Sequence, residues 1–452
     1  MSPPWPTGKK LVHLDLKGAP PRINYLLKLI DLFAELGADG LLVEYEDMFP
    51  YEGELKMLQA STQPAYSKEE VMSIQEAAKA KGLEVVPLIQ TFGHMEFVLK
   101  QDCLRDLREV DHCLGTLSPH RDRPLQLVLH MLRQVIDLHP GITTLHIGAD
   151  EVYLLGEGEE SRRWLRTSGR SVEQLFLSHV TAVARAVKTA WPHLTVLMWD
   201  DMMRDMSQDT LRDSGLVGLV QPMLWDYNPD LDVDKTVSLL EKYSGAGMAD
   251  VWAASSFKGS TSVHCCVPSS QRHVDNTLQW LRVAESVSVA VHLRGIALTG
   301  WQRYSPQIYR KSKFHKTHQD LYIFFVCCRI SQNTTMFPGR FLAEIIVDLN
   351  SFLNSEDVRY FEHNMFVRGW FSPHQRQKKM VNPLIVMQIQ SQAAAFIDEK
   401  LDVLRGEMSA LYPDSTVQEW EEEHVWPVQA SLQKVLEDTT ACLRDMLPGQ
   451  SG

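Results

Sequence analysis

The stretch Thr144-Leu145-His146-Ile147-Gly148-Ala149-Asp150 decides the fold. It is a short, mostly apolar segment that ends in a carboxylate, and it lies between two amphipathic helical patterns at residues 125–138 and 172–190. Nearly continuous apolar character is typical of a parallel strand that is covered on both faces. Segments of the same kind recur at residues 11–16, 40–45, 84–90, 195–200, 219–225, 250–255 and 295–301, and further helical patterns occupy residues 24–36, 67–81 and 271–285.

The alternation of eight such strands with helices predicts an α/β protein, a (β/α)₈ TIM barrel, rather than an open doubly wound sheet. No glycine-rich fingerprint follows the first strand, which removes the main support for dinucleotide binding. We expect residues 1–304 to form the barrel through strand eight and residues 339–452 to form a helical C-terminal region. The helical patterns of that region, at 381–411 and 417–447, are expected to pack on the barrel or against another subunit.

Residues 305–338 interrupt this pattern with a basic piece and a short apolar run. We expect this divergent segment to replace the barrel-closing helix, so that the eighth βα unit is irregular. Apolar strand faces left uncovered cost about 25 cal/mol per Å². The sequence therefore predicts a chain of low stability and low activity, unless the segment folds in a way that its pattern does not reveal.

Composition excludes several classes of function. The chain has 452 residues, 44% of them hydrophobic and 23% charged, with a net charge of −12, so clustered basic residues for nucleic acid are lacking outside one short stretch. No secretory segment and no apolar run long enough for a bilayer are visible. The seven cysteines include no CxxC pair and no zinc spacing, which favours reduced thiols. We expect a cytoplasmic and nuclear protein without metal or cofactor.

The ends of the predicted strands carry polar and aromatic side chains. In barrels of this class the active site is built from the C-terminal ends of the strands and the loops that follow. Tryptophan faces pack against the apolar faces of sugar rings, and carboxylates accept hydrogen bonds from sugar hydroxyls, so the combination indicates carbohydrate. The strand-end residues are Asp15, Glu44, Gln90, Asp150, Trp199, Trp225 and Trp301.

Asp150 and Glu151 are the adjacent carboxylates at the end of the fourth strand. Successive strand side chains point to opposite faces, so these two should not face each other across a scissile bond as a usual glycosidase pair does. The pattern favours Glu151 as a general acid and Asp150 as a group that holds part of the substrate. A solvated acidic strand end and a lone metal carboxylate are the alternatives.

The motif His146-x-Gly148-x-Asp150-Glu151 resembles that of family-20 glycoside hydrolases, the β-N-acetylhexosaminidases, and so do residues 11–20, 44–52, 90–97 and 299–304. The match is nearest to the branch of that family that lacks a signal sequence and acts in the nucleus and cytoplasm. The resemblance implies a retaining exo-β-N-acetylhexosaminidase that releases terminal N-acetylgalactosamine or N-acetylglucosamine. Family members use substrate-assisted catalysis through an oxazolinium intermediate, an exception to the two-carboxylate scheme.

The resemblance also implies roles for individual residues. Glu151 is the acid and then the base, and a raised pKa is expected for it. Asp150 orients the acetamido group, and His94 supports the acid. Trp199, Trp225 and Trp301 line the acetamido pocket, and Tyr227 bonds the acetamido carbonyl. Three further residues are predicted to bind substrate, although each also has a structural interpretation: Asp200, which supports His94 or the pocket wall, and Asp15 and Glu44, which bind hydroxyls.

One departure concerns the first strand. Many family members place a sugar-binding arginine just after it, whereas this chain has Asp15-Leu16-Lys17, so the gluco or galacto preference is open. A catalytically impaired sugar-binding barrel and a metal-dependent barrel hydrolase are the competing functions. The expected partner is a glycan or glycoconjugate with a terminal β-N-acetylhexosamine, with no nucleic acid and no membrane, and a homodimer is left open.

Overall fold

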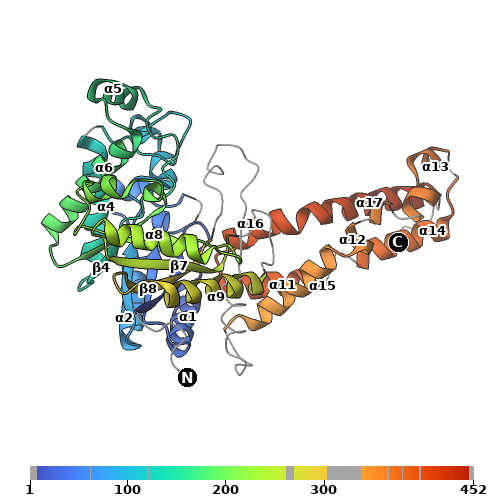
Figure 1. Ribbon diagram of the computed structural model, residues 1–452. Coiled ribbons are helices and arrows are strands. Elements are labelled where there is room, and N and C mark those ends of the chain that lie inside the picture. Colours follow the sequence, from blue (N-terminus) through green and yellow to red (C-terminus); the bar gives the residue numbers. More distant parts are fainter. Residues whose placement is uncertain are drawn as a thin grey trace. The chain divides into compact units, whose positions relative to one another are not determined.

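The predicted barrel is present in the computed structural model of the chain, which describes residues 8–61, 63–120, 122–260, 269–302, 338–359, 361–363, 366–378, 380–395 and 399–446. Parallel strands follow one another around a closed barrel, and β1 pairs with β8 to complete the ring (Figure 1). This confirms the fold class. The strands are β1 (Lys9–Asp15), β2 (Gly40–Glu44), β3 (Glu84–Leu88), β4 (Thr144–His146), β5 (Thr195–Trp199), β6 (Gln221–Trp225), β7 (Asp250–Lys258) and β8 (His292–Gly300).

The fourth strand is shorter than the sequence predicts, because it stops at His146 instead of reaching residue 150. Gly148 and Ala149 have φ values of 63° and 69°. This left-handed conformation is incompatible with a strand and is unusual for a residue other than glycine. The residues that carry the candidate chemistry therefore lie on a tight turn beyond the strand.

Helices alternate with the strands around the barrel, as the amphipathic patterns predict. Two of them begin with a capping box, in which Ser67 pairs with Glu70 and Ser171 pairs with Gln174. The helices are α1 (Ile23–Glu35), α2 (Lys68–Ala80), α3 (Glu96–Leu99), α4 (Asp122–Leu138), α5 (Glu159–Ser168), α6 (Val172–Ala190), α7 (Gln208–Arg212), α8 (Val233–Gly245) and α9 (Ser270–Ser286), and short 3₁₀ turns include η1 (Glu46–Met48) and η4 (Asp201–Met203).

Apolar side chains from the strands fill the barrel interior, so it is a packed core and not a channel. Trp225 and Trp301 pack against one end of this core while remaining partly exposed. The buried members are Leu11, Leu42, Val86, Leu88, Leu197, Trp199, Met223, Trp252, Ala254 and Ala297. The core therefore ends in aromatic rings at the edge where the strand ends converge.

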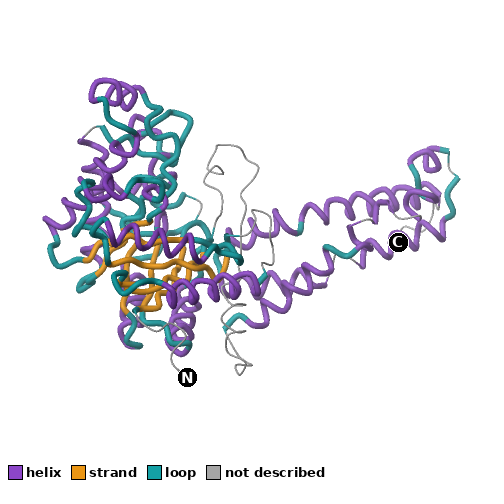
Figure 2. The backbone as a smooth tube through the Cα atoms, in the orientation of Figure 1, coloured by secondary structure: helices purple, strands orange, loops and turns teal. Residues whose placement is uncertain are grey.

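Residues from 339 onward form a second compact unit, whose described part consists of helices joined by turns and loops (Figure 2). Its own core contains Val386 and Ile389 from α14 and Leu432 and Val435 from α17. The predicted pattern at 381–411 comprises two helices, α14 and α15. The unit contains α11 (Arg340–Leu353), α12 (Glu356–Arg359), α13 (Pro373–Gln377), α14 (Pro383–Ala395), α15 (Glu399–Leu411), α16 (Asp414–His424) and α17 (Trp426–Met446).

The divergent segment at residues 305–338 lies outside the described residues except for Pro338. The irregular eighth unit, the low stability and the packing of the C-terminal region on the barrel stay predictions. Among the described residues, no helix is long and apolar enough to cross a membrane.

Candidate active site

The turn after β4 places two carboxylates beside one histidine. His94 Nε2 lies 3.2 Å from Asp150 Oδ2 and 3.3 Å from Glu151 Oε2. The alternation of strand side chains does not apply here, because Asp150 and Glu151 lie beyond β4 and Glu151 itself has a φ of 45°. The two carboxylates therefore converge on the histidine instead of pointing apart.

The close approach of two loops requires glycine at position 93. A Cβ atom there would lie 1.9 Å from the backbone oxygen of Asp150, which is far inside van der Waals contact. The absence of a side chain lets the loop after β3 pass against the turn after β4. This contact brings His94, with a φ of 51°, up to the carboxylates.

The charges of this cluster differ from the sequence-based expectation for Glu151. Burial alone would raise its pKa, but hydrogen bonding and attraction from His94, with a further hydrogen bond from Tyr153, hold the pKa of Glu151 below its usual value. Burial opposes protonation of His94, yet Asp150 and Glu151 raise its pKa well above the ordinary value. The expected raised pKa of Glu151 is therefore wrong for the free chain, and the opposite directions of the two pKa shifts favour a proton on the imidazole.

Gln90 and Glu44 extend the cluster into the barrel. Gln90 Nε2 donates to Asp150 Oδ1 at 3.1 Å and to Glu44 Oε1 at 3.3 Å. Glu44 is fully buried, and its other oxygen lies 3.3 Å from His13 Nε2. Glu44 is thus joined to Asp150 through one side chain.

Asp15 lies where the barrel closes. It is 4% exposed, and its Oδ2 atom accepts the backbone N–H of Gln302 at 2.8 Å, which ties the end of β1 to the segment after β8. The same oxygen lies 3.0 Å from Lys17 Nζ. Asp15 therefore has a structural role in closing the ring, whatever it contributes to binding.

Four aromatic side chains gather at the same edge of the barrel. Trp225 stacks on Tyr227, with ring centroids 5.4 Å apart and planes at 17°. Trp301 meets Trp199 at 6.0 Å and the edge of Tyr227 at 6.4 Å. The indole N–H of Trp199 is buried and has no hydrogen-bond partner among the described residues. The predicted wall residues are therefore contiguous.

Asp200 is bound by Arg204 and Tyr243 behind the Trp225 ring. It is fully buried, and Arg204 donates to both of its oxygens, at 2.9 and 2.8 Å. The hydroxyl of Tyr243 donates to Asp200 Oδ2 at 3.0 Å. With its oxygens engaged by these groups, Asp200 positions Arg204, whose guanidinium lies 4.6 Å from the Trp225 ring centroid. This contact agrees with a role of Asp200 in supporting the pocket wall, and its predicted binding of substrate stays a prediction.

Asp201, which the sequence analysis does not single out, also lies in the site. Its Oδ2 atom accepts the backbone N–H of Glu151 at 2.9 Å, and its Oδ1 atom accepts from the Trp225 indole at 3.4 Å. Burial and the neighbouring Asp150 raise the pKa of Asp201 to about 7. Its place beside Asp200 at the end of a barrel strand is the only sequence signal that could have identified it.

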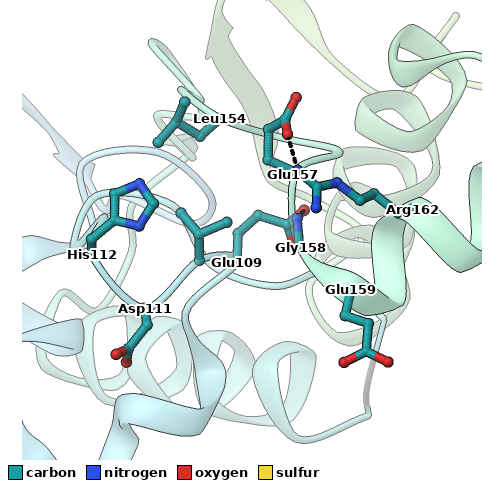
Figure 3. A pocket seen from close by; sticks show the side chains of 9 residues that line it. Glu109, Asp111, His112, Leu154, Glu157, Gly158, Glu159 and Arg162 are labelled. Carbon is teal, nitrogen blue, oxygen red and sulfur yellow. Dashed lines mark hydrogen bonds and ion pairs between the residues drawn. The ribbon is translucent and has the colours of Figure 1, made fainter.

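A separate pocket of about 470 Å³ lies between the loops that follow β3 and β4, and none of the predicted site residues lines it (Figure 3). Its charged groups include a Glu157–Arg162 ion pair and the buried Glu109, which accepts the backbone N–H groups of Gly156 and Gly158. The lining residues are Glu109, Val110, Asp111, His112, Leu154, Glu157, Gly158, Glu159 and Arg162. In the described part of the chain, no group of three or more His, Cys, Asp or Glu residues is arranged to hold a metal ion.

Comparison with known proteins gives the following relationships. The catalytic-domain pattern of glycosyl hydrolase family 20 matches residues 41–227, which include His94, Asp150 and Glu151 but neither Lys17 nor Trp301. Hexosaminidase D of Homo sapiens is 43% identical over 481 aligned residues, covering 100% of this chain and 98% of its own length. Hexosaminidase D of Bos taurus is 53% identical over 295 residues, covering 65% of this chain and 84% of its own. A β-N-acetylhexosaminidase structure from Bacteroides fragilis is 15% identical, with a TM-score of 0.49, over 66% of this chain and 61% of that one.

Proposed function

The chain belongs to glycosyl hydrolase family 20 and is a glycosidase, and we propose that it releases terminal β-linked N-acetylhexosamine from glycans with retention of configuration. The observation that carries this proposal is the cluster in which His94 lies 3.2 Å from Asp150 and 3.3 Å from Glu151. The cluster brings together a proton donor and a fixed anion from the turn after β4 and a proton carrier from the loop after β3. These are the groups that a reaction with a substrate-borne nucleophile needs.

In the first step, the carbonyl oxygen of the 2-acetamido group attacks the anomeric carbon, and the bond from that carbon to the leaving-group oxygen breaks. Glu151 gives its proton to the departing oxygen. The raised pKa of His94 and the lowered pKa of Glu151 favour His94 as the holder of that proton in the free chain, so transfer from the imidazole precedes the step. A neutral sugar that excludes water from Glu151 raises the pKa of this carboxyl and favours that transfer.

In the second step, water attacks the anomeric carbon of the oxazolinium intermediate, and the bond to the acetamido oxygen breaks. The Glu151 carboxylate takes the proton from the water, which restores the acid for the next turnover. The Asp150 carboxylate orients the acetamido N–H and stabilises the positive charge that develops on the intermediate.

The aromatic residues supply the walls for the acetamido group. Trp225 and Tyr227 form a stacked pair at 5.4 Å, and the Trp199 indole N–H is a buried donor. Asp201 supports this arrangement by accepting hydrogen bonds from both the Trp225 indole and the Glu151 backbone. Rings that enclose the ligand amide keep water away from the acetamido oxygen, which leaves that oxygen free to reach the anomeric carbon in the first step.

Turnover of matched aryl glycosides by the purified full-length chain tests the proposal. We expect hydrolysis of the β-N-acetylglucosaminide, the β-N-acetylgalactosaminide or both, and none of the plain β-glucoside and β-galactoside. Comparable hydrolysis of the plain glycosides would rule out the acetamido nucleophile. Sugar binding without any turnover would support the alternative, an impaired sugar-binding barrel, and loss of activity with a chelator would support a metal-dependent hydrolase.

Further proposals rest on the sequence alone. The exo mode of cleavage rests on the resemblance, and location in the cytoplasm and nucleus also rests on the composition. The domain limits of 1–304, 305–338 and 339–452 rest on the strand and helix patterns, and a homodimer is left open. Gel filtration of the full chain tests the oligomeric state directly.

A further inference from the structure

The separate pocket between the loops after β3 and β4 is preformed. Glu109 is buried, and its Oε1 atom accepts the backbone N–H groups of Gly156 and Gly158 at 3.0 and 3.1 Å. A Cβ atom at Gly158 would lie 2.4 Å from the backbone oxygen of Glu109, so the two loops touch at this point. These contacts fix the walls of a cavity of about 470 Å³. This volume is in the range of small-molecule sites, about 300–1,000 Å³, and a preformed site needs little ordering on binding.

The pocket begins close to Glu151 along the chain. Leu154 lines it, and only three peptide units separate Leu154 from Glu151, so their Cα atoms are at most about 11 Å apart. Tyr153 connects the two, because its hydroxyl donates a hydrogen bond to the Glu151 carboxylate. Tyr153 is 53% exposed and Leu154 is 44% exposed. Exposed apolar side chains with a polar rim mark interaction sites.

The backbone at Leu154 is strained. Its φ of 58° lies in the left-handed region, which residues other than glycine seldom adopt. The Leu154 carbonyl accepts the backbone N–H of Glu157 at 3.2 Å, and the carbonyl of Tyr153 accepts the hydroxyl of Thr116 at 2.6 Å. Strain of this kind persists where the surroundings enforce it, and it is concentrated at functional sites. The surrounding loops therefore hold Leu154 in place at the pocket.

The pocket adjoins the end of the site at which the leaving group departs. A general acid lies within about 3 Å of the oxygen that it protonates, so the sugar chain beyond that oxygen begins at Glu151. The acetamido sugar itself is assigned to Asp150 and to the aromatic residues that follow β5, β6 and β8, and none of these lines the pocket. The lining residues come instead from 109–112 and from 154–162. A long leaving group therefore has this pocket as its nearest cavity among the described residues.

The charged groups of the pocket are already paired. Arg162 donates to Glu157, and Asp111 and Glu159 each form an ion pair with an arginine outside the lining. Figure 3 shows the Glu157–Arg162 pair across the pocket from Asp111 and His112. Arg162 carries five N–H donors, and each carboxylate accepts several hydrogen bonds, so pairing does not exhaust either group. Such neighbouring donors and acceptors match hydroxyl groups, which both donate and accept.

We propose that this pocket binds the outer sugars of the leaving group, which form a neutral oligosaccharide chain. This inference rests on the proposed function. Leu154 packs against the apolar face of a sugar ring, and the Glu157–Arg162 pair bonds the hydroxyls of that sugar. The lining contains four carboxylates and one guanidinium, so it repels a chain that carries a carboxylate or sulfate at this position. Binding energy from this remote part of the substrate raises kcat/KM for long glycans without any contact with the reacting atoms.

The test compares two substrates of the full-length chain. One is a trisaccharide with its terminal β-N-acetylhexosamine on a neutral disaccharide, and the other is an aryl β-N-acetylhexosaminide that is too short to fill the pocket. Arg162→Gln should lower kcat/KM for the trisaccharide by about 10-fold, mainly through KM, and by much less for the aryl glycoside. Arg166→Gln, one turn further along α5 at an exposed position outside the lining, is the control and should affect neither substrate. Equal losses on both substrates, or no loss on the trisaccharide, would overturn the inference.

Two further measurements separate the outcomes. Val110→Trp fills the pocket with a larger side chain and should reproduce the selective loss on the trisaccharide, which keeps the inference testable if one of the two variants does not fold. A trisaccharide whose outermost sugar is a uronic acid should have a kcat/KM about 10-fold below that of the neutral one at low salt, and added salt should reduce the difference. Equal values for the two trisaccharides would contradict the preference for a neutral chain. Failure of the wild-type chain to hydrolyse the aryl glycoside would instead contradict the proposed function.

Discussion

The carboxylate of Asp201 accepts the backbone N–H of Glu151 at 2.9 Å. This bond holds the turn on which the proposed acid lies, and the other oxygen of Asp201 reaches the Trp225 indole at 3.4 Å. One side chain thus links the proton donor to the aromatic wall. A displacement of the acid by even 1 Å can cost a large factor in rate, so this link matters for catalysis.

Asp201→Asn should change how stability depends on pH. Burial and Asp150 raise the pKa of Asp201 from 3.8 to about 7, so between these values the folded chain holds a proton that the unfolded chain has released. Stability should therefore fall as pH rises through this range, by at most about 1.4 kcal/mol per pH unit. Urea midpoints measured from pH 4 to 8 should show this slope in the wild-type chain and a flatter profile in Asp201→Asn. Asp209→Asn, at an exposed carboxylate on α7, is the control, and an unchanged slope in Asp201→Asn would contradict the assignment.

Glu151→Gln should remove general acid catalysis. We expect kcat to fall by at least about 100-fold for glycosides with poor leaving groups, and by less for an activated aryl leaving group that departs without protonation. Steady-state rates on both substrate types measure the difference. Asp209→Asn, at the same exposed carboxylate on α7, should have no such effect. Equal losses of kcat on the two substrate types would contradict the assignment of Glu151 as the acid.

Asp150→Asn should weaken both turnover and the binding of a thiazoline that mimics the oxazolinium intermediate. The charged partner of the acetamido N–H is lost, which should reduce inhibitor affinity by about 10- to 100-fold. Inhibition constants for the wild-type chain and the variant provide the measurement. Undiminished thiazoline affinity would mean that Asp150 does not face the acetamido group.

His94→Gln should shift the pH profile of kcat/KM. Glu151 must be protonated to act, and the proposed mechanism has His94, whose pKa is raised, hold that proton in the free chain and pass it to Glu151. Activity of the free enzyme therefore falls when the pair loses this proton at high pH. Without the imidazole, Glu151 alone must hold the proton, so the high-pH limb of kcat/KM should move to lower pH and the maximal rate should fall. A high-pH limb that stays in place or moves to higher pH would refute the role of His94 as the proton carrier.

The barrel could be predicted because its strands are apolar on both faces, and each predicted strand overlaps an observed one. The prediction erred mainly at strand ends, as at β4, where the left-handed residues Gly148 and Ala149 break the strand while the apolar pattern continues. Hydropathy records burial and not backbone conformation, so it could not place this turn.

The site could be predicted in its main residues but not in its pairings. His94, Asp150 and Glu151 meet as expected, whereas Asp200 and Asp201 could not be told apart, because both carboxylates follow the same strand. The structure distinguishes the two carboxylates by their contacts, because Arg204 donates hydrogen bonds to both oxygens of Asp200. The direction of the Glu151 pKa shift could not be predicted from the sequence either. It depends on His94, which is 57 positions away in the sequence (151 − 94 = 57) but 3.3 Å away in the structure.

The hydrogen bond from the Gln302 N–H to Asp15 can form only after the chain has been synthesised through residue 302. β1 is made first among the described strands, yet its second neighbour is β8, the last of the described strands to leave the ribosome. A nascent chain that ends before β8 exposes a long open edge on β1, which can pair with other chains. Asp15, Lys17 and Trp301 come together only when the ring closes. The sugar site is therefore acquired in a single late event, and a chain released before residue 302 should be both inactive and a substrate for chaperones.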